Sequence, residues 1–380
     1  MRKTFSYKLY RSKRSKRLHR QINVGGAIHN HCIALHRRYY RLYKKSLSLY
    51  ALNTHLAKLK KLPKYAWWKQ LGSQAIQNIA ARIDKGYQAF FANVKARKAG
   101  TIFRRVGPPS FRKVRNAKSF TLSQAGWKLL EGNRLKIGAT VYKFAKSREI
   151  DGTIKTVTIK RDPLGDLYVY FSCLLDDQPP IVRTMTGKSA GFDFGLTTYL
   201  TGSDGTEHHA PQPLKQSLKA LAKANRRLAS KKKGSHNRKQ ALMSLARVHK
   251  RIANQRQAFH WELAHSLCAA YDCIALETLN LSGMKALWGR KVSDLGFHTF
   301  VETLHYVAST TGTIVQHIGK WFPSTKLCSA CGCVNQAITL RDRVWACPDC
   351  SARHQRDLNA AVNIFREGAS SHGGNLVRLA

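Results

Sequence analysis

The stretch GFDFGLTTYLTGSDG, residues 191–205, places a single acid, Asp193, between two phenylalanines in an apolar run. This pattern predicts a buried strand, and the Ser-Asp-Gly triplet at 203–205 is typical of a hairpin turn that follows it. A carboxylate on such a strand is costly unless a metal ion or hydrogen bonds stabilise it. From this stretch alone, a metal site and an edge-strand acid without a chemical role both remain open.

Two further acids occupy similar positions far along the chain. Glu277 ends the apolar run of DCIALETLNLSGM (residues 272–284), and Asp357 begins a small-residue helical pattern in HQRDLNAAVNIF (residues 354–365). Strand ends and a helix start are where an α/β sheet gathers side chains, as in the ribonuclease H-like fold. Two Mg²⁺ ions about 4 Å apart on such carboxylates activate a water and stabilise the leaving oxygen of a phosphodiester. We therefore expect a magnesium site at Asp193, Glu277 and Asp357.

Four cysteines form a second motif between these acids. Cys328-x2-Cys331 and Cys347-x2-Cys350 are separated by fifteen residues, the spacing of a structural zinc site with four thiolates. Cys333 is a surplus thiol near them. The remaining cysteines are expected to be ordinary buried small residues; they are Cys32, Cys173, Cys268 and Cys273.

The charge of the chain indicates a polyanionic partner. The 380 residues include 66 Lys and Arg against 20 Asp and Glu, a formal net charge of +46. No acid precedes Asp84, and none lies between residues 208 and 261. Fields of this size attract nucleic acid, and phosphate neutralisation makes such binding depend steeply on salt. A merely solvated basic face is the alternative for either tract.

The segments of the chain differ in pattern. Residues 4–10 alternate as a half-buried strand, residues 22–91 have helical spacing broken near Leu62-Pro63, and residues 100–180 are β-rich, with a hairpin around residues 162–166. Residues 213–233 and 236–267 predict a helical hairpin, laid against nucleic acid or packed as a simple insertion.

Several side chains are candidate nucleic-acid contacts. Arg37, Arg38 and Tyr39 lie where cations and aromatics interleave, although core packing of the tyrosines is an open alternative. Arg112 and Lys113 lie in a Gly- and Pro-punctuated basic loop. Gln74 and Gln77, near a helix start, could read adenine edges or simply be surface glutamines. Arg356, next to Asp357, could contact a phosphate.

Four motifs in this order resemble one family. GFDFGLTTYLTGSDG, IALETLNLSGM, WFPSTKLCSACG with CPDC, and RDLNAAVNI are similar to the RuvC-like nuclease and zinc ribbon of TnpB, the transposon-encoded RNA-guided DNA nucleases related to type V CRISPR effectors. SQAIQNIAARIDKGYQAFF (residues 73–91) and GPPSFRKVRNAKSFTL (residues 107–122) resemble the family's helical recognition and wedge segments. The resemblance covers nearly the whole chain.

The resemblance implies a multidomain α+β architecture. A β-barrel wedge domain would comprise residues 1–12 and 100–182, with a helical recognition domain, 13–99, inserted in it. A ribonuclease H-like (RuvC) α/β nuclease domain would comprise residues 183–322 and 352–368, with a zinc ribbon, 323–351, inserted in it, and residues 369–380 would form a flexible tail. The first strand would return to pair with the β segment at 100–180.

The same resemblance implies the activity and the partners. The protein would bind a guide RNA from its element and cut double-stranded DNA next to a short flanking motif, using Asp193, Glu277 and Asp357 as catalytic ligands of two Mg²⁺ ions and one structural Zn²⁺ in the ribbon. It would act as a monomer in the ribonucleoprotein. A small type V CRISPR effector and a non-cleaving RNA-guided regulator are the alternatives. An unguided transposase or a plain zinc-ribbon protein would not need the upstream segments.

No signal peptide or membrane span is evident. MRKTFSYKLY lacks an apolar core after its opening charge, and the longest near-apolar run, YVYFSCLL (residues 168–175), is too short to span a bilayer. We expect a cytoplasmic, nucleoid-associated protein without membrane partners.

Overall fold

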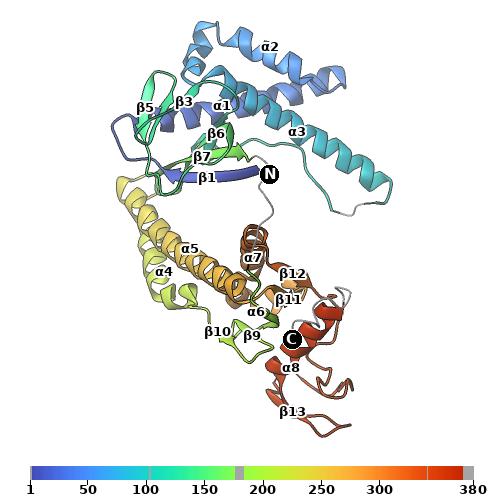
Figure 1. Cartoon of the computed structure of the whole chain (residues 1–380). Coiled ribbons are helices and arrows are strands. Elements are labelled where there is room, and N and C mark those ends of the chain that lie inside the picture. The colour runs from blue at the N-terminus through green and yellow to red at the C-terminus, as the bar shows by residue number, and fades with distance from the viewer. Residues whose placement is uncertain (1, 102–103, 176–183, 340, 371–380) are drawn as a thin grey trace. The chain divides into compact units, whose positions relative to one another are not determined.

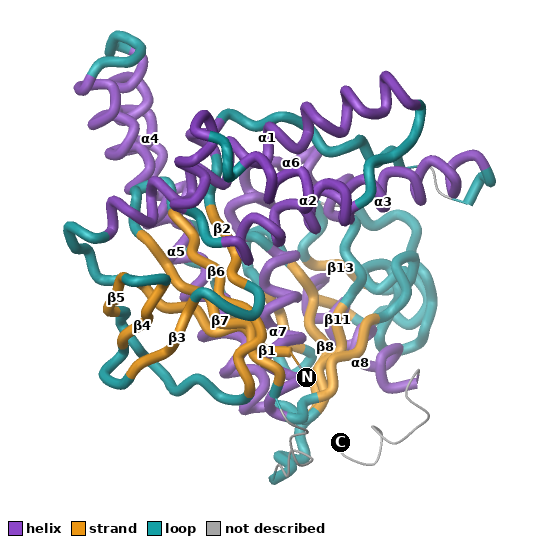
Figure 2. Tube along the Cα trace, turned by 90° about the horizontal axis from the view of Figure 1, so that it is seen from above, coloured by secondary structure: helices purple, strands orange, loops and turns teal. Residues whose placement is uncertain are grey.

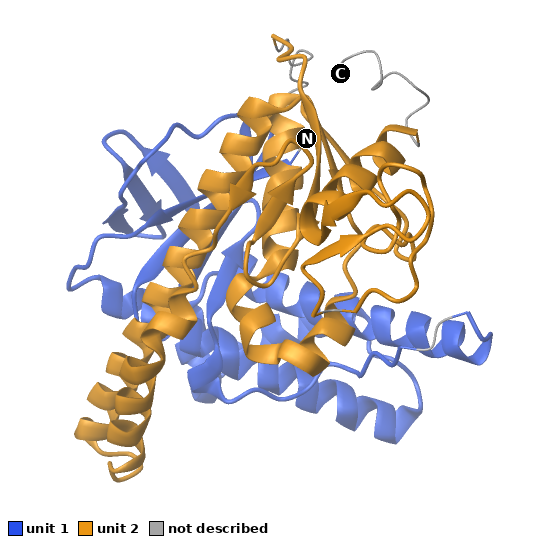
Figure 3. Ribbon diagram, turned by 90° about the horizontal axis from the view of Figure 1, so that it is seen from below, with its two compact units in different colours: residues 1–178 blue, residues 179–380 orange. Residues whose placement is uncertain are grey.

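The computed structural model describes residues 2–101, 104–175, 184–339 and 341–370. It divides the chain into two compact units, Met1–Gln178 and Pro179–Ala380, which are coloured separately in Figure 3. The boundary between the units falls beside the change from β-rich to mixed α/β pattern in the sequence.

An antiparallel sheet of four strands organises the first unit. Its order is β1 (Arg2–Lys8), β7 (Leu167–Leu174), β6 (Thr153–Arg161) and β2 (Ser119–Leu122). β1 runs antiparallel to β7 with Phe5 opposite Phe171, and Phe5, Tyr7 and Leu9 are buried. The predicted pairing of the first strand with the later β segment is therefore confirmed, as is the hairpin of β6 and β7.

A smaller meander adjoins this sheet. β3 (Trp127–Leu130), β4 (Arg134–Ile137) and β5 (Thr140–Lys143) form a second antiparallel sheet, and a bridge between Leu9 and Phe144 joins the two sheets at one corner. Near this bridge, Tyr7, Phe144 and Phe171 pack against one another at tilted angles, with ring centroids 5.3–6.0 Å apart.

Helices make up the rest of the first unit (Figure 1). They are α1 (Ser15–Tyr43), α2 (Leu49–Leu59), the 3₁₀ segments η1 (Pro63–Gln70) and η2 (Val114–Asn116), and α3 (Ser73–Lys98). The predicted break at Leu62-Pro63 separates α2 from η1. A second break was not predicted: α1 ends where Lys44 adopts a left-handed conformation with φ 53°. Few sequence signals mark such a stop, because Lys rarely adopts this conformation.

A mixed sheet of five strands organises the second unit. Its order is β10 (Glu207–His208), β9 (Leu200–Gly202), β8 (Ser189–Phe194), β11 (Cys273–Leu276) and β12 (Ile314–His317). β8, β11 and β12 are parallel, whereas β9 and β10 run antiparallel to their neighbours. The predicted turn after β9 is confirmed, with Gly205 at φ +83°.

Helices cover both faces of this sheet. α5 (His236–Ala270), α6 (Leu281–Leu295) and α7 (Phe297–Thr311) contribute to the main core with Phe192, Ile274 and Phe300. α4 (Pro213–Ala229) packs on α5, which confirms the predicted helical hairpin. On the opposite face, α8 (Arg356–Ser370) packs on β8 and β11, and Figure 2 shows these three elements side by side.

A short ribbon precedes α8. β13 (Val344–Ala346) pairs antiparallel with β14 (Arg353–Gln355), and β14 continues directly into α8. Residues 369 and 370 of the predicted tail belong to α8, and residues 371–380 lie outside the described residues. Within the described ranges, no helix combines the length and apolarity that crossing a membrane requires.

Candidate functional site

Two of the three predicted acids stand side by side at the ends of parallel strands. The last paired residues of β8 and β11 are Phe192 and Leu276, so Asp193 and Glu277 each come one position later in the same register. Phe192 and Leu276 point into the main core of the unit. Because successive side chains of a strand alternate, Asp193 and Glu277 point to the opposite face, the one that α8 covers.

A glycine brings the third acid to this face. At Gly191, a Cβ atom would lie 2.6 Å from the Ala361 carbonyl oxygen and 2.7 Å from Phe365 Cα, so the backbone of α8 rests directly on β8. Asp357 lies in the first turn of α8, one turn before Ala361, and Asp193 lies two residues beyond Gly191 on the same side of the strand. The close approach therefore directs Asp357 toward Asp193.

The electrostatics agree with this clustering. Burial raises the pKa of Asp193 well above its usual value, and the charges of Glu277 and Asp357 raise it further. Burial also raises the pKa of Glu277 to about 7, although a hydrogen bond from the Phe194 backbone acts in the opposite direction. Carboxylates that perturb one another in this way are common at functional sites.

Two arginines hold the third carboxylate. Arg356 donates to Asp357 Oδ1 from Nε at 3.0 Å and from Nη2 at 2.8 Å, and Arg343 Nη1 donates to Oδ2 at 3.1 Å. Arg356, predicted as a phosphate contact, thus lies against the neighbouring acid. Arg343 was missed by the sequence analysis, because its position beside Asp357 depends on the pairing of β13 with β14.

The carboxylates suit a hard divalent cation. Mg²⁺ prefers oxygen ligands, and the acids raise the pKa of Asp193 by mutual repulsion that a cation would relieve. Their grouping is looser than that of the cysteines, however. Among the residues the structure describes, the four predicted cysteines are the one set of three or more His, Cys, Asp or Glu side chains gathered closely enough to hold an ion.

The cysteine cluster has the dimensions of a tetrahedral thiolate site. The Sγ atoms of the four cysteines all lie within 4.8 Å of one another, with Cys331 to Cys347 at 3.6 Å and Cys328 to Cys350 at 3.7 Å. Zn–S bonds of about 2.3 Å at tetrahedral angles place the sulfurs about 3.8 Å apart. The two measured Sγ pairs match this spacing, so the four side chains suit a zinc ion.

The surroundings of the cysteines support the same interpretation. Hydrogen bonds from the Cys350 and Asp349 backbone lower the pKa of the Cys347 thiol to about 6, although burial opposes them, whereas the pKa values of Cys331 and Cys350 are raised. The metal-free cluster therefore favours a thiolate at Cys347, the form that zinc binds. His354 Nε2 lies 3.0 Å from Cys328 Sγ, and its ring packs on Trp345. His354 was not predicted. Apart from Cys333, which is partly exposed, the cysteines outside the motif are buried, as expected; they are Cys32, Cys173, Cys268 and Cys273.

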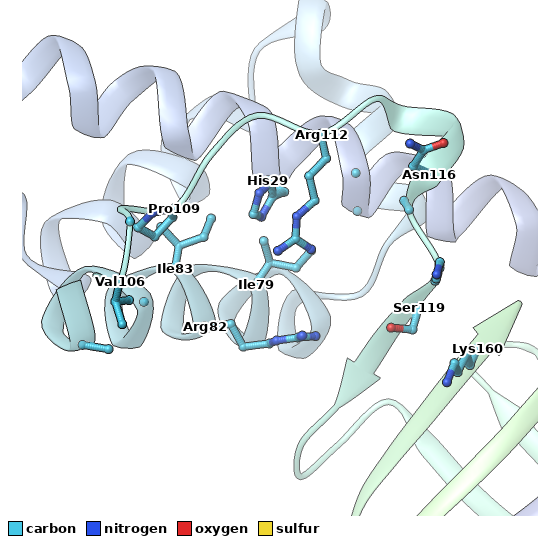
Figure 4. Close-up of a pocket in the computed structure, with 17 residues that line it drawn as sticks. His29, Ile79, Arg82, Ile83, Val106, Pro109, Arg112, Asn116, Ser119 and Lys160 are labelled. Carbon is cyan, nitrogen blue, oxygen red and sulfur yellow. The ribbon is translucent and has the colours of Figure 1, made fainter. Parts of the chain in front are cut away.

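A cation-lined groove lies in the first unit (Figure 4). Its volume is about 690 Å³, and its walls come from α1, α3 and the loop at residues 106–119. Four cations and no acid line it; they are Arg82, Arg112, Lys118 and Lys160. Arg112 belonged to the predicted contacts. The other three lie far apart in the sequence and were missed, since only the fold places them together.

The loop that forms one wall is held rigidly by two asparagines. Asn30 donates to the Arg112 carbonyl at 2.7 Å and accepts from its N–H at 2.9 Å. Asn93 donates to the Arg104 carbonyl and accepts from the Val106 N–H, both at 2.9 Å. These bonds hold the loop against α1 and α3, so the groove is preformed.

The other predicted contacts lie on the helices of the first unit. Gln74 and Gln77 belong to the first turns of α3, where Gln77 is exposed and Gln74 is partly buried. Arg37 stacks over Phe111 at 4.7 Å, and Arg38 is exposed. Tyr39 packs against the core, whereas Tyr40 and Tyr43 are exposed, so core packing accounts for only part of this aromatic group. Lys113 lines a second basic hollow next to the groove.

Two family models match the chain. Residues 172–287 match the IS605 OrfB model, described as "Probable transposase", and residues 297–364 match the TNB domain of Cas12f1-like proteins. The first match contains Asp193 and Glu277. The second contains the four cysteines of the cluster and Asp357.

Two relatives agree with these matches. A protein of Streptomyces pristinaespiralis named "Putative RNA-guided DNA endonuclease" is 28% identical, over all of this chain and 92% of its own. The TnpB-like protein L79 of Acanthamoeba polyphaga mimivirus is 26% identical over 63% of this chain and 49% of its own.

A solved structure shares the fold. The protein chain in a Cas12f1–sgRNA–target DNA complex superposes with a TM-score of 0.55 at 13% identity, covering 93% of this chain and 83% of that chain. The likeness confirms the multidomain α+β class expected from the sequence.

Proposed function

The chain belongs to the TnpB family, and from that premise we propose that it is an RNA-guided DNA endonuclease of a transposon. It would bind a guide RNA from its element and cut double-stranded DNA beside a short flanking motif. The observation that carries the proposal is the register of Asp193 and Glu277 at the ends of β8 and β11, with the helix of Asp357 resting on the same face.

The three acids would bind the metal ions at the scissile phosphate from two sides. Asp193 and Glu277 project from adjacent strands and would provide ligand oxygens from one side, and Asp357 would provide them from the helix. Two Mg²⁺ ions at such a site supply an activated water and stabilisation of the leaving 3′ oxygen. Arg343 and Arg356 form ion pairs with Asp357, so a metal ion would compete with their charges for this carboxylate.

The cysteine cluster serves a structural role in this proposal. Four thiolates close the coordination of zinc and leave no position for substrate. The ribbon is inserted directly before α8, so a bound zinc ion would order the segment that leads to Asp357.

The first unit would bind nucleic acid. The preformed groove with Arg82, Arg112, Lys118 and Lys160 presents cations without a competing acid, which suits a phosphate backbone. In family terms, β1 and the β segment that it pairs with would form the wedge domain, and α1 to α3 the recognition domain. The five-stranded sheet with α8 would form the RuvC-like domain, with the zinc ribbon inserted in it. The protein would act as a monomer with its RNA.

Two related functions remain as alternatives. A small type V CRISPR effector would use the same acids, and a repeat array next to the gene would distinguish it. A guide-dependent regulator without cleavage would leave the acid cluster unused. The intact set of Asp193, Glu277 and Asp357 favours the nuclease over the regulator.

The test is a plasmid cleavage assay with a randomised flank beside the target. The protein is purified with RNA from its native locus and supplied with Mg²⁺. Asp193→Asn removes one acid of the cluster, and Asp151→Asn removes an exposed acid outside it as the matched control. We expect specific flanks to be depleted with the native protein and the control but not with Asp193→Asn. Target binding without cleavage by all three proteins would reject the nuclease and favour the regulator.

A further inference from the structure

Helix α8 carries two buried asparagines that the reaction does not require. Asn359 and Asn363 are only 3% and 2% exposed. They are four residues apart and therefore lie on one face of the helix. A buried amide is costly unless its donors and acceptor are satisfied, so their partners identify what this face holds.

All the partners found belong to one short segment of the ribbon. Asn359 Nδ2 donates to the Leu327 carbonyl at 2.7 Å, and its Oδ1 accepts from the Ser329 N–H at 2.9 Å. Asn363 Nδ2 donates to the Leu327 carbonyl at 2.6 Å and to the Ser324 carbonyl at 2.8 Å. These four bonds enclose Cys328 on both sides.

The opposite stripe of α8 faces the sheet. Ala361 contacts the backbone of β8 at Gly191, and at Gly368 a Cβ atom would lie 2.6 Å from that of Ala275 on β11. Asp357 precedes Ala361 by one turn and shares this stripe. α8 therefore contacts two neighbours through opposite faces. One face packs on the sheet and places Asp357 near the acids of β8 and β11. The other face is hydrogen-bonded to the backbone of the cysteine loop, residues 324–329.

We propose that Asn359 and Asn363 are positioning residues that couple the metal at the cysteine cluster to the location of Asp357. A zinc ion fixes the loop around Cys328, the amides transmit that order to α8, and α8 sets Asp357 against Asp193 and Glu277. The role assigned to Asp357 rests on the proposed nuclease function. The bond between the cysteine loop and the helix does not.

Coupling of this kind is reciprocal. If zinc stabilises the seating of α8 through the amides, the seated helix must stabilise bound zinc to the same extent. Breaking the amide bonds should therefore loosen zinc and also raise the Mg²⁺ concentration that cleavage requires. If the amides served only local packing, their loss would not change zinc binding and the Mg²⁺ requirement together.

Near-isosteric substitutions test this in the protein–RNA complex. Asn359→Asp and Asn363→Asp keep side-chain size but replace the donors to Leu327 and Ser324 by an acceptor. Asn335→Asp is the control: it lies within the ribbon and accepts only from the Ala337 N–H in the bonds found, which a carboxylate also does. Asn359→Ser, which adds no charge, serves if an Asp variant does not fold.

The first readout is the rate of zinc release to a chromogenic chelator, which needs no cleavage. We expect release at least about fivefold faster in the Asn359 and Asn363 variants, the lower end of typical coupling energies, and unchanged in Asn335→Asp. Native release rates in both asparagine variants would overturn the proposal.

The second readout is the Mg²⁺ concentration at half-maximal cleavage. We expect the asparagine variants to need about fivefold more or higher, with guide RNA binding unchanged. Faster zinc release with an unchanged Mg²⁺ requirement would show that the amides hold only the loop, and would overturn the coupling to Asp357. If the native protein does not cleave, the proposed function fails, and zinc release alone still decides whether the amides stabilise the metal.

Discussion

Gly191 and Ala361 meet so closely that a Cβ atom at residue 191 would lie 2.6 Å from the Ala361 carbonyl oxygen. The contact is between backbones, so neither side can yield by turning a side chain. It seats the helix that carries Asp357 on the strand that carries Asp193.

Gly191→Ala should therefore displace α8. Overpacking of this kind typically costs about 1–3 kcal/mol, and we expect a lower melting temperature together with a loss of cleavage larger than the loss of folded protein. Gly289→Ala is the control, because nothing lies within 4 Å of a Cβ there. Full cleavage by Gly191→Ala would contradict the seating of Asp357 by this contact.

Glu277→Gln should abolish cleavage yet stabilise the protein in the presence of a chelator. The pKa of Glu277 is about 7 in the folded chain against an ordinary 4.5. Its contribution to stability is therefore present below pH 4.5 and is lost as the pH rises through 7. Glu277→Gln has no carboxyl group to ionise at this position. Its free energy of unfolding should therefore exceed that of the native protein by a margin that grows by about 3 kcal/mol across that range.

Denaturant unfolding from pH 5 to pH 8 measures this difference. Glu131→Gln, which changes an exposed glutamate between β3 and β4, is the control and should follow the native curve. A difference between Glu277→Gln and the native protein that does not change with pH would contradict the buried position of this carboxylate.

Arg343→Gln should lower the Mg²⁺ requirement of cleavage. Arg343 pairs with Asp357 Oδ2 at 3.1 Å while more than half of its side chain is exposed. An exposed pair of this kind is worth up to about 1 kcal/mol, so removing the competing cation should shift the half-saturating Mg²⁺ concentration downward by no more than about fivefold. A higher requirement would indicate that Arg343 orients Asp357 instead of competing for it.

Lys160→Gln should weaken nucleic-acid binding and make that binding less dependent on salt concentration. Lys160 lines the groove of the first unit, and Lys155 lies on the same strand outside it. Loss of one phosphate contact reduces the slope of log K against log salt by about 1. Binding measured between low and high salt should show this for Lys160→Gln and not for Lys155→Gln. Equal slopes in both variants would show that Lys160 in the groove does not contact the nucleic acid.

The sequence predicted the parts of the site that local patterns carry. Asp193, Glu277 and the four cysteines each lie in a short segment whose spacing indicates its role, and the structure gathers the cysteines as expected. In the first unit, the alternation of Phe5 and Tyr7 predicted a strand, and the family resemblance implied its partner, the later β segment. The roles of the acids and the domain boundaries remain predictions.

What could not be predicted depends on the path of the chain between elements. Arg343 and His354 reach their partners only because β13 and β14 pair in one register. The groove joins side chains from α3, a loop and β6, which no local pattern connects. Gln74 and Gln77 stay untested as base contacts, since an exposed amide on a helix has the same sequence signal whether or not it reads DNA.

The order of the elements along the chain has a consequence for synthesis. The strands of Asp193 and Glu277 are made first, and the helix that covers both of them follows only after the ribbon. A nascent chain therefore lacks a complete set of acids until the ribbon has been translated, and by then the segments proposed to bind nucleic acid have already emerged. Translation itself would delay cutting until the chain has had the opportunity to take up its guide.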